Sequence, residues 1–286
     1  MIGYIVDVEF VWGFQARIAG LSKTPPSFYY PPPTTFLGAL AEVIAKEYEV
    51  GESKGREIIP KLSENLLAIG WRPINCFPLK YADINRIITI RRVGVKDRES
   101  GRDVGILAPH PSYLDKSFDS PARGKTILSA LDYEAPKIKW FLVFRNGWFK
   151  FNGDKIEVRT DLFWKIHRLG SKESRVSVVD VAKVDIDVIK RKVITNYSFP
   201  IEDGINPTMK KRGKWEFEIY INPFEVRTYD DKENPVINYI SGKRALPFRI
   251  PILTSVLSLP EYIVEFSEGF AAYKFKKEMV IGRWSK

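Results

Sequence analysis

Residues 28–40 combine side chains and backbone groups that could bind an anionic ligand. Two tyrosines precede the prolines at residues 31–33, which favour an extended backbone. The two threonines that follow are expected to cap a helix, and the amide N–H groups at a helix start can bind a phosphate group. The tyrosine rings could stack on a base, although an ordinary junction between a loop and a helix has the same composition. The candidates of this segment are Tyr29, Tyr30, Thr34, Thr35 and Gly38.

A second segment, residues 167–175, could bring backbone amides close to a phosphate. A glycine follows an expected helix and is flanked by serines and basic side chains. Because glycine has no Cβ, the backbone there can approach a phosphate closely. The same sequence could also simply end a helix in a Schellman turn. The candidates of this segment are His167, Arg168, Gly170, Ser171, Lys172, Ser174 and Arg175.

Basic side chains recur along the rest of the chain, which has 45 Lys and Arg against 35 Asp and Glu and a formal net charge of +10. This balance favours an anionic partner, most often a nucleic acid and less often an acidic membrane surface. Each cluster alone could be solvated surface, including those at residues 210–212 and 243–244. Their number, with interleaved aromatics, supports binding of single-stranded RNA or DNA. The remaining candidates are Arg17, Lys23, Arg91, Arg92, Lys96, Arg98, Arg102, Arg123 and Lys125.

Catalytic and metal chemistry has few candidate residues. Two histidines and one cysteine cannot form a zinc cluster, and no spacing of carboxylates suggests another cation site, so we expect neither a metal nor a cofactor. His167 is the best candidate for a general acid or base in RNA cleavage. A histidine near a helix C-terminus can equally have a purely structural role. An endoribonuclease therefore remains the alternative to a binding protein.

The composition also indicates the cellular setting. A single cysteine allows no internal disulfide and suggests the cytoplasm. No run of eighteen apolar residues occurs, and Asp7 and Glu9 interrupt the first ten residues, so we expect neither a membrane span nor a signal peptide. Abundant Lys, Arg, Glu and Ile with a single glutamine suggest a thermophilic source.

The first half of the chain predicts a strand, two helices and a further strand. Alternating apolar residues predict the first strand over residues 4–10, and helical periodicity predicts helices over 35–48 and 60–69. A second strand is predicted over 84–93. Residues 94–125 show little periodicity, and we predict that they form a protruding arm, with a disordered surface insertion as the alternative.

The second half predicts mostly strands. Two Asn-Gly pairs predict tight turns that join residues 137–145, 148–151 and 155–159 into a three-stranded antiparallel meander. A short helix is expected over 161–169. Further strands are expected over residues 175–187, 190–197, 215–221 and 261–266. The chain therefore predicts an α+β fold with antiparallel sheets.

Two motifs resemble the fifth Cas protein family of the RAMP superfamily. The first is Trp-Gly-Phe at residues 12–14, followed by the aromatic and proline-threonine run at 28–35 and by Leu-Gly-Ala-Leu at 37–40. The second is Arg-Leu-Gly-Ser-Lys-Glu-Ser at residues 168–174. The wording of the first motif is most similar to archaeal members of subtype I-A.

The resemblance implies a ferredoxin-like (RRM-like) palm in residues 1–135, with a long thumb inserted at about 94–125. Residues 136–286 would form a β-rich region packed on the palm as one compact unit. The protein would be a non-catalytic subunit of a type I-A CRISPR Cascade complex that binds and caps the 5′ handle of the crRNA in antiviral defence. Its partners would be the crRNA, the backbone, large and small subunits, and the interference helicase and nuclease. Target DNA would be contacted indirectly, since guide pairing reads its sequence.

In one subtype, members of the same family are metal-independent endoribonucleases that cleave repeat RNA with a tyrosine, a lysine and a histidine. Here His167 has Lys165 and Lys172 nearby but no tyrosine within the motif. The triad therefore cannot be assigned from the sequence. The resemblance to subtype I-A implies binding without catalysis.

Overall fold

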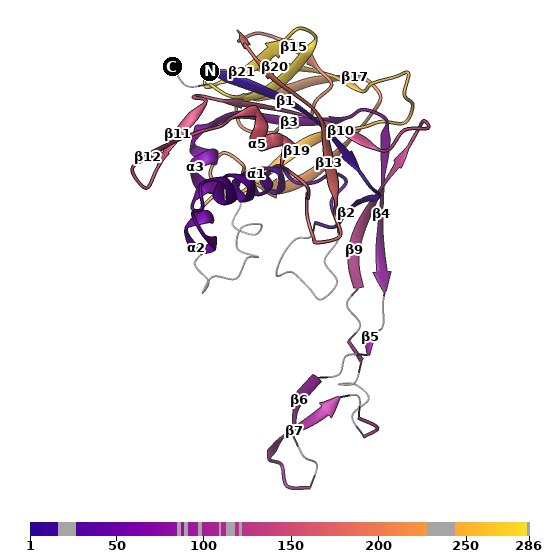
Figure 1. Ribbon diagram of the computed structural model, residues 1–286. Helices are drawn as coiled ribbons and strands as arrows, with labels where there is room; N and C mark the ends of the chain where they lie inside the picture. The colour runs from indigo at the N-terminus through magenta and orange to yellow at the C-terminus, as the bar shows by residue number, and fades with distance from the viewer. Residues whose placement is uncertain are drawn as a thin grey trace.

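Antiparallel strands dominate the fold in a computed structural model of the 286-residue chain. A seven-stranded sheet carries helices on one face, and a long arm extends away from it (Figure 1). The fold class is therefore mixed α and β, with strands predominating. The structure describes residues 1–16, 27–84, 87–88, 91–96, 99–108, 110–112, 118–119, 122–227 and 244–284.

The seven-stranded sheet has the order β13-β1-β10-β3-β22-β21-β14, and neighbouring strands are antiparallel. Its strands are β1 (Ile2–Phe10), β3 (Leu66–Pro73), β10 (Lys137–Phe144), β13 (Val176–Val184), β14 (Asp187–Ile189), β21 (Phe270–Phe275) and β22 (Glu278–Arg283). The expected strand at residues 4–10 is thus confirmed as β1. The division of the chain at residue 135 stays a prediction; in the sheet, β1 and β3 from the first part both pair with β10 from the second.

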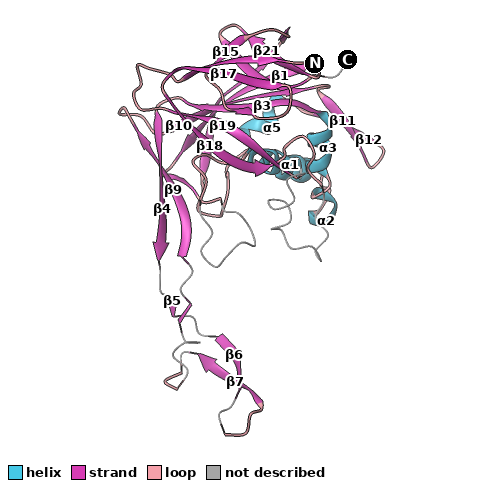
Figure 2. Ribbon diagram, turned by 180° about the vertical axis from the view of Figure 1, so that it is seen from behind, coloured by secondary structure: helices cyan, strands magenta, loops and turns pink. Residues whose placement is uncertain are grey.

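The helices lie together on one face of this sheet (Figure 2). They are α1 (Pro33–Glu47), α2 (Glu52–Gly55), α3 (Ile58–Asn65) and α5 (Thr160–Trp164). Between helices and sheet lies an aromatic core in which Phe36 of α1 packs on Trp140 of β10, with ring centroids 4.7 Å apart. Trp71 of β3 continues the stack at 5.1 Å from Trp140. The helical periodicity of residues 35–48 therefore reflects burial against this sheet.

The start of α1 differs from the prediction. The N-cap residue is Pro32, with no side-chain capping bond, and the helix begins at Pro33. Proline suits the first helical position because its missing N–H would have no partner there and its φ is already helical. Thr34 and Thr35 are consequently helical residues, so the expectation that they cap the helix is wrong.

An arm extends from the sheet, and its described part starts before residue 94, where the predicted arm begins. Its root is a long hairpin of β4 (Cys76–Ile84) and β9 (Ala122–Ala130). Farther out, β5 (Ile87–Ile88) pairs with β8 (Phe118–Asp119), and β6 (Arg91–Lys96) pairs with β7 (Asp103–Ala108) (Figure 1). The single strand expected over residues 84–93 is therefore divided among β4, β5 and β6.

The remaining strands form small sheets. The orders are β15-β20-β17, β16-β19-β18 and β2-β9-β4, together with the hairpin β11-β12. Their bounds are β2 (Gly13–Phe14), β11 (Trp148–Phe151), β12 (Asp154–Glu157), β15 (Val193–Thr195), β16 (Phe199–Pro200), β17 (Ile205–Arg212), β18 (Lys214–Ile221), β19 (Ala245–Ile252) and β20 (Glu261–Phe266).

The helix predicted over residues 60–69 is half wrong. Helix α3 ends at Asn65, and Leu66–Pro73 forms strand β3, which is buried along most of its length. A continuous apolar run of this kind fits a central strand as well as a buried helix, so periodicity could not separate them. Gly70 lies inside the strand rather than ending a helix. Glycine is needed at this position because a Cβ would lie 2.7 Å from the carbonyl oxygen of Ser198.

The three-stranded meander is also wrong. Strand β10 pairs with β1 and β3, whereas β11 pairs with β12. The second Asn-Gly turn has the expected positive φ angles, 50° at Asn152 and 92° at Gly153. The following helix, α5, ends at Trp164 rather than at residue 169.

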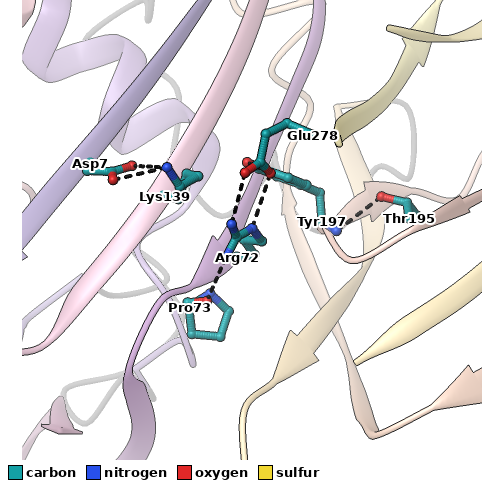
Figure 3. Close-up of polar contacts among 7 residues, drawn as sticks. All are labelled: Asp7, Arg72, Pro73, Lys139, Thr195, Tyr197 and Glu278. Atoms are coloured by element: carbon teal, nitrogen blue, oxygen red, sulfur yellow. Dashed lines mark hydrogen bonds and ion pairs between the residues drawn. The ribbon is translucent and has the colours of Figure 1, made fainter. Parts of the chain in front are cut away.

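Ionic contacts join neighbouring strands of the seven-stranded sheet (Figure 3). The guanidinium of Arg72 on β3 lies 3.0 Å from the carboxylate of Glu278 on β22. The hydroxyl of Tyr197 donates a hydrogen bond of 2.7 Å to the same carboxylate. Next to them, Lys139 Nζ lies 3.0 Å from both carboxylate oxygens of Asp7. Burial alone would raise the pKa of Glu278, but Arg72 and Tyr197 outweigh it and hold that pKa below its ordinary value.

Glu278→Gln is expected to lower the free energy of unfolding at pH 7 by about 1–3 kcal/mol, because the neutral amide leaves Arg72 without its counter-ion. The pKa of Glu278 is lowered in the folded state, so its stabilising effect is present above its ordinary value of 4.5 and is lost as the pH falls through the folded value. Urea unfolding at pH 7 and at about pH 3 should therefore give a difference from wild type that shrinks in acid. Glu268→Gln, at an exposed position, is the control. An equal difference at both pH values would contradict this role.

Candidate nucleic-acid interface

The start of α1 borders a cavity of about 220 Å³. Thr34 and Thr35 line it together with Ile221 at the end of β18 and two cations, Arg227 and Arg244. The N–H of Thr34 has no acceptor within the helix, as is usual for the first turn. Two threonines and two arginines thus line one space at a helix N-terminus, and their hydroxyl and guanidinium groups could accept a phosphate group there.

The position of Arg244 depends on pairing between distant segments. Its carbonyl oxygen accepts a hydrogen bond of 2.8 Å from the N–H of Asn222, beside the ladder that joins β18 to β19. Glu225 also lines the cavity, but its carboxylate lies 2.7 Å from the guanidinium of Arg283. Its negative charge is therefore matched outside the cavity. Arg227 was not a sequence candidate, and the only signal for Arg244 was the basic pair at residues 243–244.

The two tyrosines before the prolines have other partners than a base. Tyr30 is fully buried, so its expected stacking on a base is corrected. Tyr29 is partly exposed, and its N–H donates hydrogen bonds of 3.0 and 2.9 Å to the two carboxylate oxygens of Glu218. Lys80 Nζ lies 3.6 Å from the centroid of the Tyr29 ring. One face of that ring is therefore occupied by a cation.

The turn at residues 168–175 packs on the N-terminal motif. The N–H of Ser171 donates to the carbonyl oxygen of Gln15 at 2.9 Å, and the N–H of Gln15 donates to Ser174 Oγ at 2.9 Å. Gly170 has a φ of +123°, and a Cβ there would lie 2.7 Å from the carbonyl oxygen of Gln15. The close approach that glycine permits is thus to the chain's own backbone.

Side chains of the same turn form a basic surface. Those of His167, Lys172 and Arg175 are exposed, whereas Ser174 is buried. Arg168 lies 2.9 Å from Glu42 on α1, so part of its charge is already matched. The Nδ1 atom of His167 lies 3.4 Å from the carbonyl oxygen of Lys165. Among the described residues, no tyrosine hydroxyl is hydrogen-bonded to the His167 ring.

The residues Trp12 to Gln15 connect this turn to the root of the arm. The indole N–H of Trp12 donates to the carbonyl oxygen of Glu173 at 2.9 Å, while the carbonyl oxygen of Trp12 accepts the N–H of Leu128 on β9 at 3.0 Å. Gly13 pairs with Ile127, and a Cβ on Gly13 would lie only 2.1 Å from the carbonyl oxygen of Thr126. The structure therefore brings the first and second sequence motifs together.

The other candidates follow the arm or lie outside the described residues. Lys96 and Arg102 are exposed on the distal arm, far from α1 in both views (Figures 1 and 2). Lys125 lies in β9 near the root. Arg91 and Arg92 lie in β6, and Arg123 lies in β9. Arg17, Lys23 and Arg98 lie outside the described residues. Gly38 is in the second turn of α1, where a Cβ would meet only Ile59, at 3.9 Å.

In the part of the chain that the structure describes, no group of three or more His, Cys, Asp or Glu side chains could hold a metal ion. Within the same ranges, no helix has the length and apolar character needed to cross a membrane.

Gly170→Ala is expected to lower the free energy of unfolding by more than about 2 kcal/mol, because both the positive φ and the contact with Gln15 oppose a Cβ. Gly153→Ala is the matched control: its φ is +92°, but nothing lies within 4 Å of the new Cβ, so it should lose only about 1 kcal/mol. Urea unfolding followed by circular dichroism measures both. Equal losses would show that the contact with Gln15 is not the cause.

Comparison with known proteins identifies the family. The family model described as CRISPR-associated protein (Cas_Cas5) matches residues 3–238. One relative, "CRISPR-associated protein Cas5 2" of Saccharolobus solfataricus, is 25% identical over 96% of this chain and 100% of that protein. Another from the same organism, "CRISPR system aCascade subunit Cas5 1", is 27% identical over 94% of this chain and 96% of its own length.

A solved structure agrees with this relationship. The crystal structure of a CRISPR protein from Archaeoglobus fulgidus has 52% sequence identity and a TM-score of 0.70, covering 99% of this chain and 100% of that one. The resemblance drawn from the two sequence motifs is thereby confirmed. The chain belongs to the Cas5 family of CRISPR-associated proteins.

Proposed function

We propose that this protein is the subunit of a type I-A CRISPR Cascade complex that binds and caps the 5′ handle of the crRNA in antiviral defence in the cytoplasm. The observation that carries the proposal is the cavity at the start of α1, where Thr34, Thr35, Arg227 and Arg244 converge. A relative that bears the name of an aCascade subunit supports the assignment to such a complex.

The RNA would be held mainly through its phosphates. The hydroxyls of Thr34 and Thr35, the N–H of Thr34 and the two guanidinium groups suit one phosphate of the handle. The N–H of Thr35 already donates to the carbonyl oxygen of Pro32. Contacts of this kind fix the register of a nucleic acid without reading its sequence. The exposed cations Lys96 and Arg102 on the arm would lie against the first guide–target segment, and guide pairing would read the target.

We further propose that β1, α1, β3, β10, α5 and β13 form a ferredoxin-like (RRM-like) palm, with the arm as its inserted thumb. The strand order β13-β1-β10-β3, antiparallel throughout, supports this assignment. It corresponds to a β-α-β-β-α-β unit in which the first and third strands are central. The crRNA, the backbone, large and small subunits, and the interference helicase and nuclease are the proposed partners.

Binding of the handle is tested with the full chain and a single-stranded RNA that carries the repeat-derived 5′ handle. Arg244→Met should weaken binding about five- to tenfold and reduce the slope of log affinity against log salt by about one, because one phosphate contact is lost. Thr34→Val, which removes only a hydroxyl, should weaken binding less and leave the slope unchanged. Fluorescence anisotropy at several salt concentrations measures both quantities.

Lys192→Met is the control for this experiment, because its cation pairs with Glu265 on β20 and lies outside the cavity. It should bind the RNA as wild type does. Wild-type protein that fails to bind the handle RNA at moderate salt would overturn the proposed function. Equal losses of affinity in Arg244→Met and Lys192→Met would show that the protein binds this RNA only through non-specific charge.

We also propose that the protein does not cleave RNA. Incubation of the full chain with labelled repeat RNA in EDTA should leave the RNA intact, because the exposed His167 ring has no tyrosine hydrogen-bonded to it among the described residues. Site-specific cleavage by wild type that disappears in His167→Ala would instead establish the endoribonuclease alternative. Lys172→Ala serves as a control for loss of charge in the same turn.

A further inference from the structure

Glu218 on β18 gathers hydrogen-bond donors around a nearly buried carboxylate. The residue is 8% exposed. Its Oε1 atom accepts from Lys80 Nζ at 3.1 Å, and its Oε2 atom accepts from the hydroxyl of Tyr220 at 2.6 Å. Both oxygens also lie within 3.0 Å of the Tyr29 nitrogen. Among the described residues, three donors therefore converge on this one carboxylate.

Two of these donors belong to parts of the protein that are far apart in the sequence. Lys80 lies in β4 at the root of the arm, opposite Thr126 of β9. Tyr29 lies just ahead of the prolines that lead into α1. Lys80 also contacts the ring of Tyr29, with its Nζ 3.6 Å from the centroid. One carboxylate thus connects the arm root to the segment before α1.

The same strand reaches the candidate RNA-binding cavity. Ile221, three residues beyond Glu218, lines that cavity and pairs with Ala245, which follows Arg244. On the other side, the prolines at residues 31–33 restrict the chain between Tyr29 and the first turn of α1. A rigid path therefore runs from Glu218 to both walls of the cavity.

Burying the charge of Glu218 costs free energy, which indicates that this carboxylate fixes the positions of its partners rather than adding stability. Burial raises the pKa of Glu218, against the opposing effects of Tyr220, Lys80 and Tyr29. A buried ion pair adds little net stability compared with an apolar residue of similar size. The pair instead fixes the positions of Lys80 and Tyr29 relative to Glu218, because charge-assisted hydrogen bonds require a specific geometry.

We propose that Glu218 is a positioning residue that holds the arm root and the cavity at the start of α1 in one fixed relative geometry. It does not touch RNA itself. It acts through Lys80 and Tyr29, so that phosphate contacts on the arm and in the cavity stay in register. The RNA part of this proposal rests on the proposed function; the geometric part does not.

Hydrogen–deuterium exchange of the full chain without RNA tests the geometric part. In Glu218→Gln, amides at residues 29–35 and at the arm root, 76–84 and 122–130, should exchange at least tenfold faster, while β10 remains unchanged. The affinity for the handle RNA should fall about tenfold. The melting temperature should fall only slightly, and less than in Glu278→Gln, because the side chain of Lys80 is 34% exposed and stays hydrated, whereas that of Arg72 is 12% exposed. Glu216→Gln is the matched control, because Glu216 lies on the same strand and pairs with Lys214 at 3.1 Å.

Lys80→Met tests the same contact from the side of the arm. The side chain of Lys80 is 34% exposed, so the fold tolerates its loss more readily than the loss of Glu218. It should give the same local pattern, and the double variant should be no worse than Glu218→Gln alone. Faster exchange throughout the chain, additive effects in the double variant, or no change at the arm root would each overturn the proposal. If wild type does not bind the RNA, the proposed function fails, whereas the exchange pattern still decides the positioning role.

Discussion

The contacts of the short segment Trp12–Gln15 set the relative positions of the parts that carry the candidate interface. Its backbone pairs with β9 on one side and with the turn at residues 168–175 on the other. Both contacts are too close for a Cβ, at Gly13 against Thr126 and at Gly170 against Gln15. Two glycines therefore allow three backbone segments to meet, and the arm root and the basic turn are fixed to the same end of β1.

Local sequence patterns predicted the elements whose burial is one-sided. Strand β1 alternates, and α1 has helical periodicity, because each buries one face in the common core. Strand β3 gives no such signal, since it is buried nearly throughout. The meander failed for a related reason: β10 finds its partners in β1 and β3, which are distant in sequence, and no turn residue encodes that choice.

The candidate site was predictable only in its local parts. The proline-threonine run and the glycine at residue 170 were visible as unusual backbone, but the partner of Gly170 is Gln15 rather than a phosphate. The cavity itself depends on the pairing of β18 with β19, which brings Arg244 beside α1. Tyr30 was predicted to stack on a base but is a buried core residue. An aromatic residue next to prolines can have either role, so the local sequence could not separate them.

The net charge also overstates the number of cations that are available to bind RNA. Arg168 is paired with Glu42, and Arg283 with Glu225. Lys211 and Arg212, from the basic cluster at residues 210–212, lie in β17 and both contact Glu261. A surplus of +10 therefore does not locate a site, because paired and unpaired cations count alike in a composition.

The arm makes precision at its root a physical requirement. Strand β4 has nine residues, which corresponds to a length of about 30 Å. A tilt of about 10° at the root would therefore displace the far end of this strand by about 5 Å, close to the spacing of neighbouring strands. The root is held by the pairing of Gly13 with Ile127, by the hydrogen bond between Ser27 and Thr126, and by Lys80 on Glu218. Lys80 and Thr126 are paired across the hairpin, so their contacts hold the same face, whereas Gly13 pairs along the outer edge of β9. Together the face and edge contacts oppose tilting in more than one direction, which neither kind could do alone.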